Sequence, residues 1–304
     1  QLASKLIGLL AYQQYMQSKG EKVKVDKAIR PIIHRLTNHQ NKHQLWSWWG
    51  NSENTSFWMS AHILRALKMA QDAGYPVELN LNGLKVEYAH TRPYRGMKLE
   101  DIEILHALHE WKVEADYSSA VRLLEPFVRQ LEQKEDSLAN RNKYYRPLSY
   151  LKEKLLLWEI KQQVDSVNVS DSVRPYLKKD LLGGVYCDDG RRTYYWEGNQ
   201  LINTLIAYRI IKNDFSLWKL KENMQLYILR TKERGWNTYQ ASSAVATVLT
   251  DLLAGSGGMS GTLVSVSGKD HQRITEFPYH ARLTAGDSLL ISKTGKEPLL
   301  YSVY

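Results

Sequence analysis

The stretch Leu45–Val77 constrains the fold more than any other part of the chain. It holds a tryptophan cluster, a polar turn at Gly50–Asn54, and then apolar residues at spacings of three and four. That spacing predicts one long amphipathic helix. Asn54 is the expected N-cap, because its side chain can accept a hydrogen bond from the first turn. Gly74 and Pro76 are expected to end the helix.

The same arrangement returns at Val185–Lys212 and at Gly235–Leu253, where aromatic residues and a polar turn again precede a helical pattern. Such a recurrence indicates a degenerate repeat of helical hairpins. Paired helices with short loops predict a mainly α fold, an α/α toroid of about eleven to twelve helices with one inner and one outer helix in each hairpin.

Proline and charge suggest where some helices begin and end. Pro31 lies inside the periodic segment Val25–Leu36, so that helix is expected to begin near Arg30. The helix Tyr117–Leu131 is expected to lead into a charged connector, Glu132–Arg146. The other helices are expected at Leu2–Gln17, Leu79–Ala89, Leu99–Trp111, Leu148–Val164, Asp171–Leu182 and Trp218–Leu229.

The composition changes at Gly255–Gly258. Beyond it, apolar and polar residues alternate with period two between glycine turns, which predicts roughly four short strands. These are too few for an independent sandwich. We therefore expect an α/α toroid over residues 1–255, and over 256–304 a β segment that belongs to a sheet whose other strands are missing or lie outside this sequence.

The 304 residues carry a net charge of +9, which raises the question of nucleic acid. The basic runs Lys19–Lys27, Arg141–Arg146 and Arg230–Arg234 are short, separated and mixed with acids, so solvated helix faces are the favoured interpretation and no nucleic-acid partner is expected. No apolar run reaches the ~20 residues that span a membrane. The chain begins within an apolar helix and ends within a strand-like run, as expected for a piece of a longer polypeptide.

Acidic residues in the repeat turns could form a glycosidase-like or lyase-like pair across the toroid. Asp188, Asp189 and Glu197 lie in the second aromatic unit, and Glu53 lies in the first. The favoured interpretation is that they cap helices and balance helix dipoles. A carbohydrate-active toroid enzyme that uses Asp189 and Glu197 stays open as an alternative.

No metal or cofactor site is expected. Cys187, the single cysteine, adjoins Asp188 and Asp189, but a zinc site of this kind would need a later histidine, and none occurs between His109 and His271. The glycine-rich residues 255–261 precede a strand, which does not fit a phosphate-binding loop. The helical histidines are interpreted as packing or surface residues: His62, His106 and His109.

Several segments together resemble the thioester domain of bacterial α2-macroglobulins, which are relatives of complement C3-type proteins. They are QLASKLIGLLAYQ, LWSWW, SFWMSAHILRALKMAQDAGYPV and RGWNTYQASSAVATVLTDLL. ARLTAGDSLLISKTGKEPLLYSVY resembles the strands that follow that domain, which implies that residues 256–304 form part of a CUB-like β-sandwich domain. The resemblance covers nearly the whole chain and is strongest at residues 45–77 and 235–304. The family's fold, an α/α toroid, agrees with the periodicity.

The resemblance implies a broad-spectrum endopeptidase inhibitor of the bacterial envelope, in the periplasm or at the cell surface, and no enzyme. A protease cuts a bait segment of the full-length protein and is then caged. The implied partners are target proteases and neighbouring macroglobulin domains of the same chain. A non-catalytic toroid that only mediates contacts is a further alternative. The β segment favours the macroglobulin interpretation, because an enzyme does not explain strands that need outside partners.

The resemblance also implies roles for single residues. Gln1 stands where the glutamine of the family's Cys-x-Glu-Gln thioester motif would stand, with the cysteine upstream of this sequence, and Cys187 cannot replace it. His90 is the nearest candidate for the family's assisting histidine. Trp46, Trp48 and Trp49 could form an aromatic docking surface for neighbouring domains or could pack inside the toroid, and both possibilities stay open.

Overall fold

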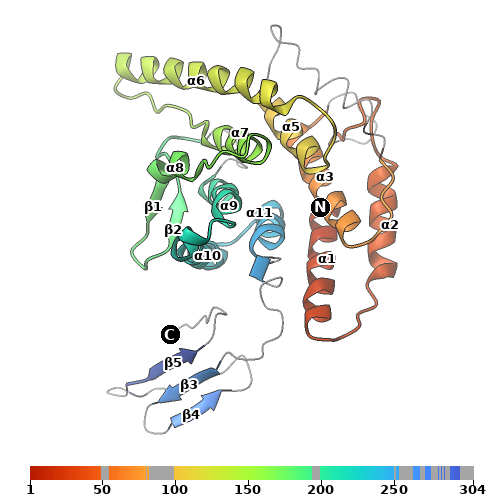
Figure 1. Cartoon of the computed structure of the whole chain (residues 1–304), viewed down its shortest axis with the longest axis vertical. Helices are drawn as coiled ribbons and strands as arrows, with labels where there is room; N and C mark the ends of the chain where they lie inside the picture. Colours follow the sequence, from red (N-terminus) through yellow and green to blue (C-terminus); the bar gives the residue numbers. More distant parts are fainter. Residues whose placement is uncertain are drawn as a thin grey trace.

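A computed structural model describes residues 1–48, 55–79, 81, 99–193, 199–249, 251–252, 263–267, 271–274, 280, 282, 284 and 288–294. It is mainly helical, with short antiparallel strands (Figure 1). No helix in these ranges is long and apolar enough to cross a membrane. The α-helices are α1 (Leu2–Ser18), α2 (Asp26–Thr37), α3 (Phe57–Asp72), α5 (Glu100–Glu110), α6 (Tyr117–Arg141), α7 (Leu151–Val164), α8 (Ser170–Val173), α9 (Gln200–Ile211), α10 (Trp218–Thr231) and α11 (Thr238–Ala244), which continues as a π-helical turn over Val245–Leu249.

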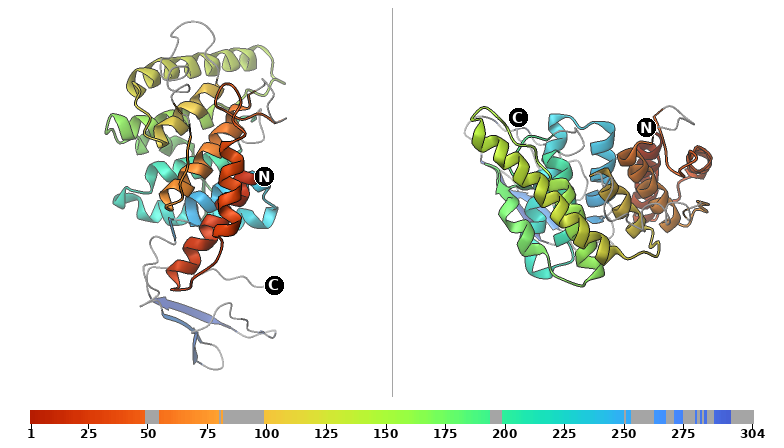
Figure 2. Two further views of the ribbon diagram at one scale, coloured as in Figure 1. Left: turned by 90° about the vertical axis from the view of Figure 1, so that its right-hand side faces the viewer. Right: turned by 90° about the horizontal axis from the view of Figure 1, so that it is seen from above.

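The odd-numbered long helices form a closed ring. Helix α1 packs against α3, α3 against α5, α5 against α7, α7 against α9 and α9 against α11, and α11 returns to α1. The intervening helices lie outside this ring: α2 on α1 and α3, α6 on α7 and α5, and α10 on α9. Figure 2 shows the helical part from two further sides. This inner and outer order is the helical toroid that the repeated hairpins predict.

The apolar faces divide into two helical cores and one small β core. One helical core is built around α1, α2 and α3, and the other around α6, α7, α9 and α10; α5 contributes to both. Helix α9 is buried over most of its length and α3 over its middle part, as expected for inner helices of such a fold. The buried polar side chains of these helices therefore face the ring axis or a neighbouring helix.

Helix α3 begins later than predicted. Ser56 occupies its N-cap position, and the expected cap Asn54 lies outside the described residues. Its end agrees with the prediction, because Gly74 takes φ +88° and Tyr75 donates its backbone N–H to Ala70. The helix expected at Leu79–Ala89 also lies almost wholly outside the described residues.

Two predicted helix boundaries are wrong. Helix α2 begins at Asp26, so Pro31 lies within it. Proline has no backbone N–H to donate to the Lys27 carbonyl, but Pro31 and Lys27 are both exposed, so water can replace the missing hydrogen bond. Helix α6 continues through the expected connector to Arg141, because buried Glu135 accepts hydrogen bonds from the Tyr145 hydroxyl and the Leu148 N–H.

The predicted helix Asp171–Leu182 is also corrected. Only Ser170–Val173 is α-helical; a 3₁₀ turn follows over Arg174–Tyr176, and then a hairpin of β1 (Leu177–Lys179) and β2 (Val185–Cys187). Gly183 turns this hairpin at φ +83°, a conformation that glycine adopts without strain. The C-terminal sheet has the antiparallel order β4–β3–β5, with β3 (Leu263–Ser267), β4 (His271–Ile274) and β5 (Leu290–Thr294). The predicted domain limits stay a prediction.

Candidate functional site

The polar residues that open α11 form a capping box. The Asn237 side chain accepts from the Gln240 N–H at 2.9 Å, and the Gln240 side chain accepts from the Asn237 N–H at 3.0 Å. The Trp236 indole donates to the Thr231 hydroxyl at 3.1 Å. This segment carries part of the family resemblance, and the two amides in it hold the start of an inner helix.

The first turns of α1, α3 and α11 meet in a cluster of hydroxyls around His62. The Ser4 hydroxyl lies 3.0 Å from His62 Nε2, and the Ser242 hydroxyl lies 3.0 Å from that of Ser4 and 3.4 Å from Nε2. His62 is 7% exposed. Burial, with the charge of Arg65, lowers the pKa of His62 to about 3. The imidazole is therefore neutral at physiological pH.

A file of aromatic rings leads from the surface to His62. Trp48 is 62% exposed, and its ring centre lies 5.5 Å from that of Trp58. Trp58 lies 5.5 Å from Tyr239, and Tyr239 lies 4.9 Å from His62 in an edge-to-face contact. We call these four residues the aromatic file; it runs beside the N-terminal end of α1.

Of the predicted site residues, Gln1 occupies the exposed N-cap position of α1, one turn before Ser4. Trp46 is 3% exposed, and its indole donates to the Leu36 carbonyl at 2.8 Å, so it packs inside the toroid. Of the two possibilities left open for these tryptophans, Trp46 shows packing inside the toroid, whereas Trp48 keeps an open face. His90 and Trp49 lie outside the described residues.

Deeper along the ring axis lies a buried ionic network that sequence reasoning missed. Glu159 accepts two hydrogen bonds from Arg209, both at 2.7 Å, and one contact of 2.8 Å from His106 Nε2. Arg65 contacts His106 Nδ1 at 3.1 Å and donates to Glu110 at 3.0 Å. Four inner helices, α3, α5, α7 and α9, are tied together by this chain of charges.

The pKa shifts within the network follow from these pairings. Burial opposes ionisation, but the Arg65 charge outweighs it and lowers the pKa of Glu110 to about 2. The Arg209 charge likewise holds the pKa of Glu159 well below its usual range against burial. Burial would lower the pKa of His106, yet the charges of Glu159 and Glu110 raise it. Arg65 is thus matched by Glu110 and Arg209 by Glu159, and His106 lies between the two carboxylates.

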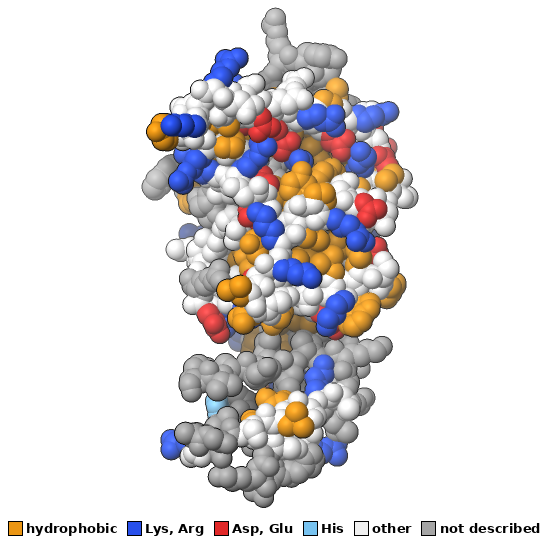
Figure 3. Space-filling view, turned by 90° about the vertical axis from the view of Figure 1, so that its left-hand side faces the viewer, with side chains coloured by type: hydrophobic (Ala, Val, Ile, Leu, Met, Phe, Trp, Pro, Cys, Tyr) orange, Lys and Arg blue, Asp and Glu red, His pale blue; other side chains and the backbone are white. Residues whose placement is uncertain are grey.

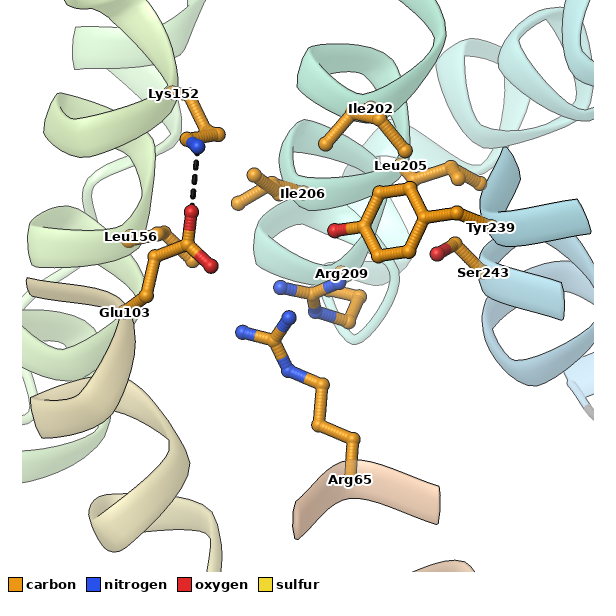
Figure 4. Close-up of a pocket in the computed structure, with 10 residues that line it drawn as sticks. All are labelled: Arg65, Glu103, Lys152, Leu156, Ile202, Leu205, Ile206, Arg209, Tyr239 and Ser243. Atoms are coloured by element: carbon orange, nitrogen blue, oxygen red, sulfur yellow. Dashed lines mark hydrogen bonds and ion pairs between the residues drawn. The ribbon is translucent and has the colours of Figure 1, made fainter. Parts of the chain in front are cut away.

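A small cavity lies beside this network (Figure 4). Lys152, paired with Glu103, lines it opposite Tyr239, whose hydroxyl points inward, and the guanidinium groups of Arg65 and Arg209 approach from below. The cavity has room for roughly one water molecule. The cavity suits a solvent molecule and is too small for a sugar ring.

The acids considered for a carbohydrate enzyme have structural partners. Asp188 accepts from Lys178 at 2.9 Å, and Asp189 accepts from the Ser149 hydroxyl at 2.7 Å and the Arg191 N–H at 3.0 Å. Glu53 and Glu197 lie outside the described residues. The two described acids therefore hold the β1–β2 hairpin and the loop before α7 together, and neither of them is the N-cap of α7 or α9.

Cys187 is buried in β2, and its backbone N–H donates to the Thr204 hydroxyl at 2.9 Å. Burial raises the pKa of its thiol to about 12, so the thiolate that binds metals or attacks substrates is disfavoured. Within the described ranges, no group of three or more His, Cys, Asp and Glu side chains is arranged to hold a metal ion.

The low pKa of His62 gives a pH-dependent stability. Below pH ~6.5 the His62 imidazole takes up a proton in the unfolded chain but stays neutral in the folded chain. The contribution of His62 to the free energy of unfolding therefore falls by about 1.4 kcal/mol per pH unit between pH ~6.5 and ~3. His106 contributes with the opposite sign, because its pKa is raised. The effect of His62 is therefore isolated by comparing wild type with His62→Gln in urea denaturation at several pH values. The stability difference should shift in favour of the variant as pH falls, and a constant difference from pH 7 to pH 4 would contradict this assignment.

The chain was compared with known proteins. No protein-family model and no curated protein sequence matches it. Its fold is similar to that of solved bacterial α-2-macroglobulins. Trypsin-activated α-2-macroglobulin from Escherichia coli matches with a TM-score of 0.55 at 14% identity, over 96% of this chain and 19% of that one. The E. coli protein activated by porcine elastase matches with a TM-score of 0.55 at 12% identity, over 96% of this chain and 24% of that one. The chain thus has a macroglobulin-like fold and spans about a quarter or less of these proteins.

Proposed function

We propose that this chain is the thioester-type ring domain of a bacterial α2-macroglobulin-like endopeptidase inhibitor, with part of the β domain that follows it. The observation that carries the proposal is the fold match over 96% of the chain, which includes the closed helical ring. The sequence resemblance at residues 45–77 and 235–304 supports it independently.

The proposed role is capture without turnover. The two similar structures are described as activated by trypsin and by porcine elastase. By analogy, a target protease cuts a bait segment elsewhere in the full-length protein, the domains rearrange, and the protease is enclosed. The partners in this proposal are proteases and neighbouring macroglobulin domains, and the location is the periplasm or the cell surface.

The proposed covalent step uses the acyl group of Gln1. A thioester would join its side-chain carbonyl to the thiol of an upstream cysteine. An amine of the protease would attack that carbonyl, so that an amide bond forms, the C–S bond breaks, and the cysteine leaves as a free thiol. Gln1 begins α1, beside the aromatic file and one turn from Ser4. In this proposal the file limits access of water, and His90 assists the transfer.

Trapping is tested on the full-length protein. Trypsin is added in slight excess, and the complex is separated by size-exclusion chromatography. Enclosed trypsin should keep its activity on a small chromogenic peptide and lose most of its activity on a large protein substrate. Equal loss on both substrates would indicate an ordinary active-site inhibitor, and no loss on either would contradict the inhibitor proposal.

The role of Gln1 is tested separately with methylamine. Intact mass of the full-length protein should show one adduct together with one newly titratable thiol. Gln1→Ala should abolish both, whereas Gln17→Ala, an exposed glutamine on the same helix, should leave both unchanged. If wild type forms no adduct while trypsin is still enclosed, the covalent step is refuted and the trapping proposal remains.

A further inference from the structure

The free end of α6 forms a basic surface that the toroid does not use. Residues 141–146 contain three basic residues and two tyrosines, without an acid. Arg141 ends α6, and the chain then turns: the Tyr144 N–H donates to the Asn142 side chain at 3.0 Å, and the Tyr145 N–H donates to the Asn142 carbonyl at 2.9 Å. This turn leaves Arg141, Lys143 and Tyr144 exposed.

A fourth cation joins the surface from a distant part of the chain. The Arg192 N–H donates to the Pro147 carbonyl at 3.1 Å, and the Arg192 carbonyl accepts from the Ser149 N–H at 2.8 Å. Arg192 is exposed beside the segment that follows the turn. We call Arg141, Lys143, Tyr144, Arg146 and Arg192 the α6 tip.

The neighbouring acids are already paired and do not neutralise the tip. Glu132 accepts from Lys154, Asp136 from Arg191, and Glu135 from the Tyr145 hydroxyl and a backbone N–H. The four tip cations have no ion pair within the described part of the chain. The acids near these cations in the sequence precede the run, on α6, and the folded structure gives them other partners.

The tip projects and carries an exposed aromatic ring. Helix α6 is 25 residues long, and its C-terminal end extends away from α5 along one edge of the molecule (Figure 1). Figure 3 views the molecule from the side at which this helix ends and shows basic side chains spread over the upper part of that face. Tyr144 is 80% exposed, and Lys143 Nζ lies 5.1 Å from its ring centre.

We propose that the α6 tip binds the surface of an anionic phospholipid membrane. Exposed cations are attracted to anionic headgroups, and a tyrosine ring suits the boundary between polar headgroups and acyl chains. A projecting helix end can reach a flat headgroup plane without rearranging the ring. A nucleic-acid duplex fits less well, because it offers phosphates along a line, whereas the tip gathers its charge at one point.

The test uses sedimentation of the 304-residue protein with vesicles of pure phosphatidylcholine, or of phosphatidylcholine with about one third phosphatidylglycerol. The wild type should partition to the anionic vesicles and lose this preference at high salt. Arg141→Gln/Lys143→Gln should weaken the partitioning by up to about thirty-fold, since each cation contributes a factor of about five. Lys22→Gln/Lys24→Gln removes the same charge from exposed residues between α1 and α2, and should weaken it much less.

Other outcomes overturn the proposal. If the two double variants lose partitioning equally, only net charge matters and the tip is not the site. If the wild type ignores anionic vesicles but is retained on immobilised polyglutamate through Arg141 and Lys143, the partner is an acidic polypeptide. Retention on duplex DNA with the same dependence would assign nucleic acid. Matching far-ultraviolet circular dichroism and melting temperatures exclude misfolding of the variants. Because trapping and methylamine reactivity do not involve the tip, this proposal and the proposed inhibitor function can fail separately.

Discussion

Glu159→Gln is expected to lower the free energy of unfolding by about 3–5 kcal/mol, because it removes one partner from a buried ionic network. Glu159 is 6% exposed and is bound by Arg209 through two hydrogen bonds and by His106 through one contact. Glutamine keeps the volume of the side chain but not its charge. Arg209, whose side chain is 19% exposed, would then lose its counter-ion at a largely enclosed position.

The measurement is urea denaturation of the wild type and the variant at neutral pH. Glu125→Gln is the matched control. Glu125 on α6 pairs with Lys161 on α7, the helix that also carries Glu159, but this pair is partly exposed. That substitution should cost about 1 kcal/mol or less. A cost for Glu159→Gln as small as that of the control would show that the network does not hold the ring together.

Trp46→Ala is expected to cost about 3–5 kcal/mol of folding stability, since it empties the space of a buried indole. The substitution also removes the donor to the Leu36 carbonyl, which is buried at the end of α2. Trp46 therefore joins α2 to the segment before α3. The loss is measured by urea denaturation, with near-ultraviolet circular dichroism to follow the packing of the remaining tryptophans.

The neighbouring Trp48→Ala is the control for this substitution. Trp48 is 62% exposed and contacts the Trp58 ring, so its removal should cost about 1 kcal/mol or less. Similar costs for the two variants would refute the assignment of Trp46 to the core.

In the proposed full-length inhibitor, Trp48→Ala should instead speed the reaction with methylamine, because it shortens the aromatic file.

Local sequence signals predicted the ring helices well. Spacings of three and four located α1, α3, α7, α9 and α11, since each inner helix must bury an apolar face. Glycine at position 74 ended α3 through its positive φ, as predicted. The antiparallel strands of the C-terminal segment also followed from period-two alternation, with Val264, Val266 and Ile274 facing inward.

What the sequence could not predict depends on contacts between distant residues. Helix α6 extends to Arg141 because Glu135 is held by Tyr145 and Leu148, and no local signal distinguishes this from a charged connector. The ionic network was missed for a related reason: a charged residue in a helix looks like part of a solvated face. One usable signal is Glu159, which lies among leucines and Ile160 in a helix that is apolar on more than one side.

The Trp-Asn-Thr segment illustrates a mixture of the two cases. Its residues support a family resemblance, yet the structure gives Asn237 and Gln240 a local role as a capping box. The hydroxyl of Ser242, one turn later, takes part in a contact that no local rule suggests, with Ser4. Residues of a motif can thus have a structural role in the helix that they open.

The contact that closes the ring has a consequence for the order in which the chain folds. Ser4 and Ser242 are separated by 238 positions, so α1 cannot meet its second inner neighbour until α11 has left the ribosome. Until then α1 and α9 each lack the inner neighbour that α11 provides. Closure of the ring therefore depends on contacts of high sequence separation, which are slow to form and become available last during synthesis.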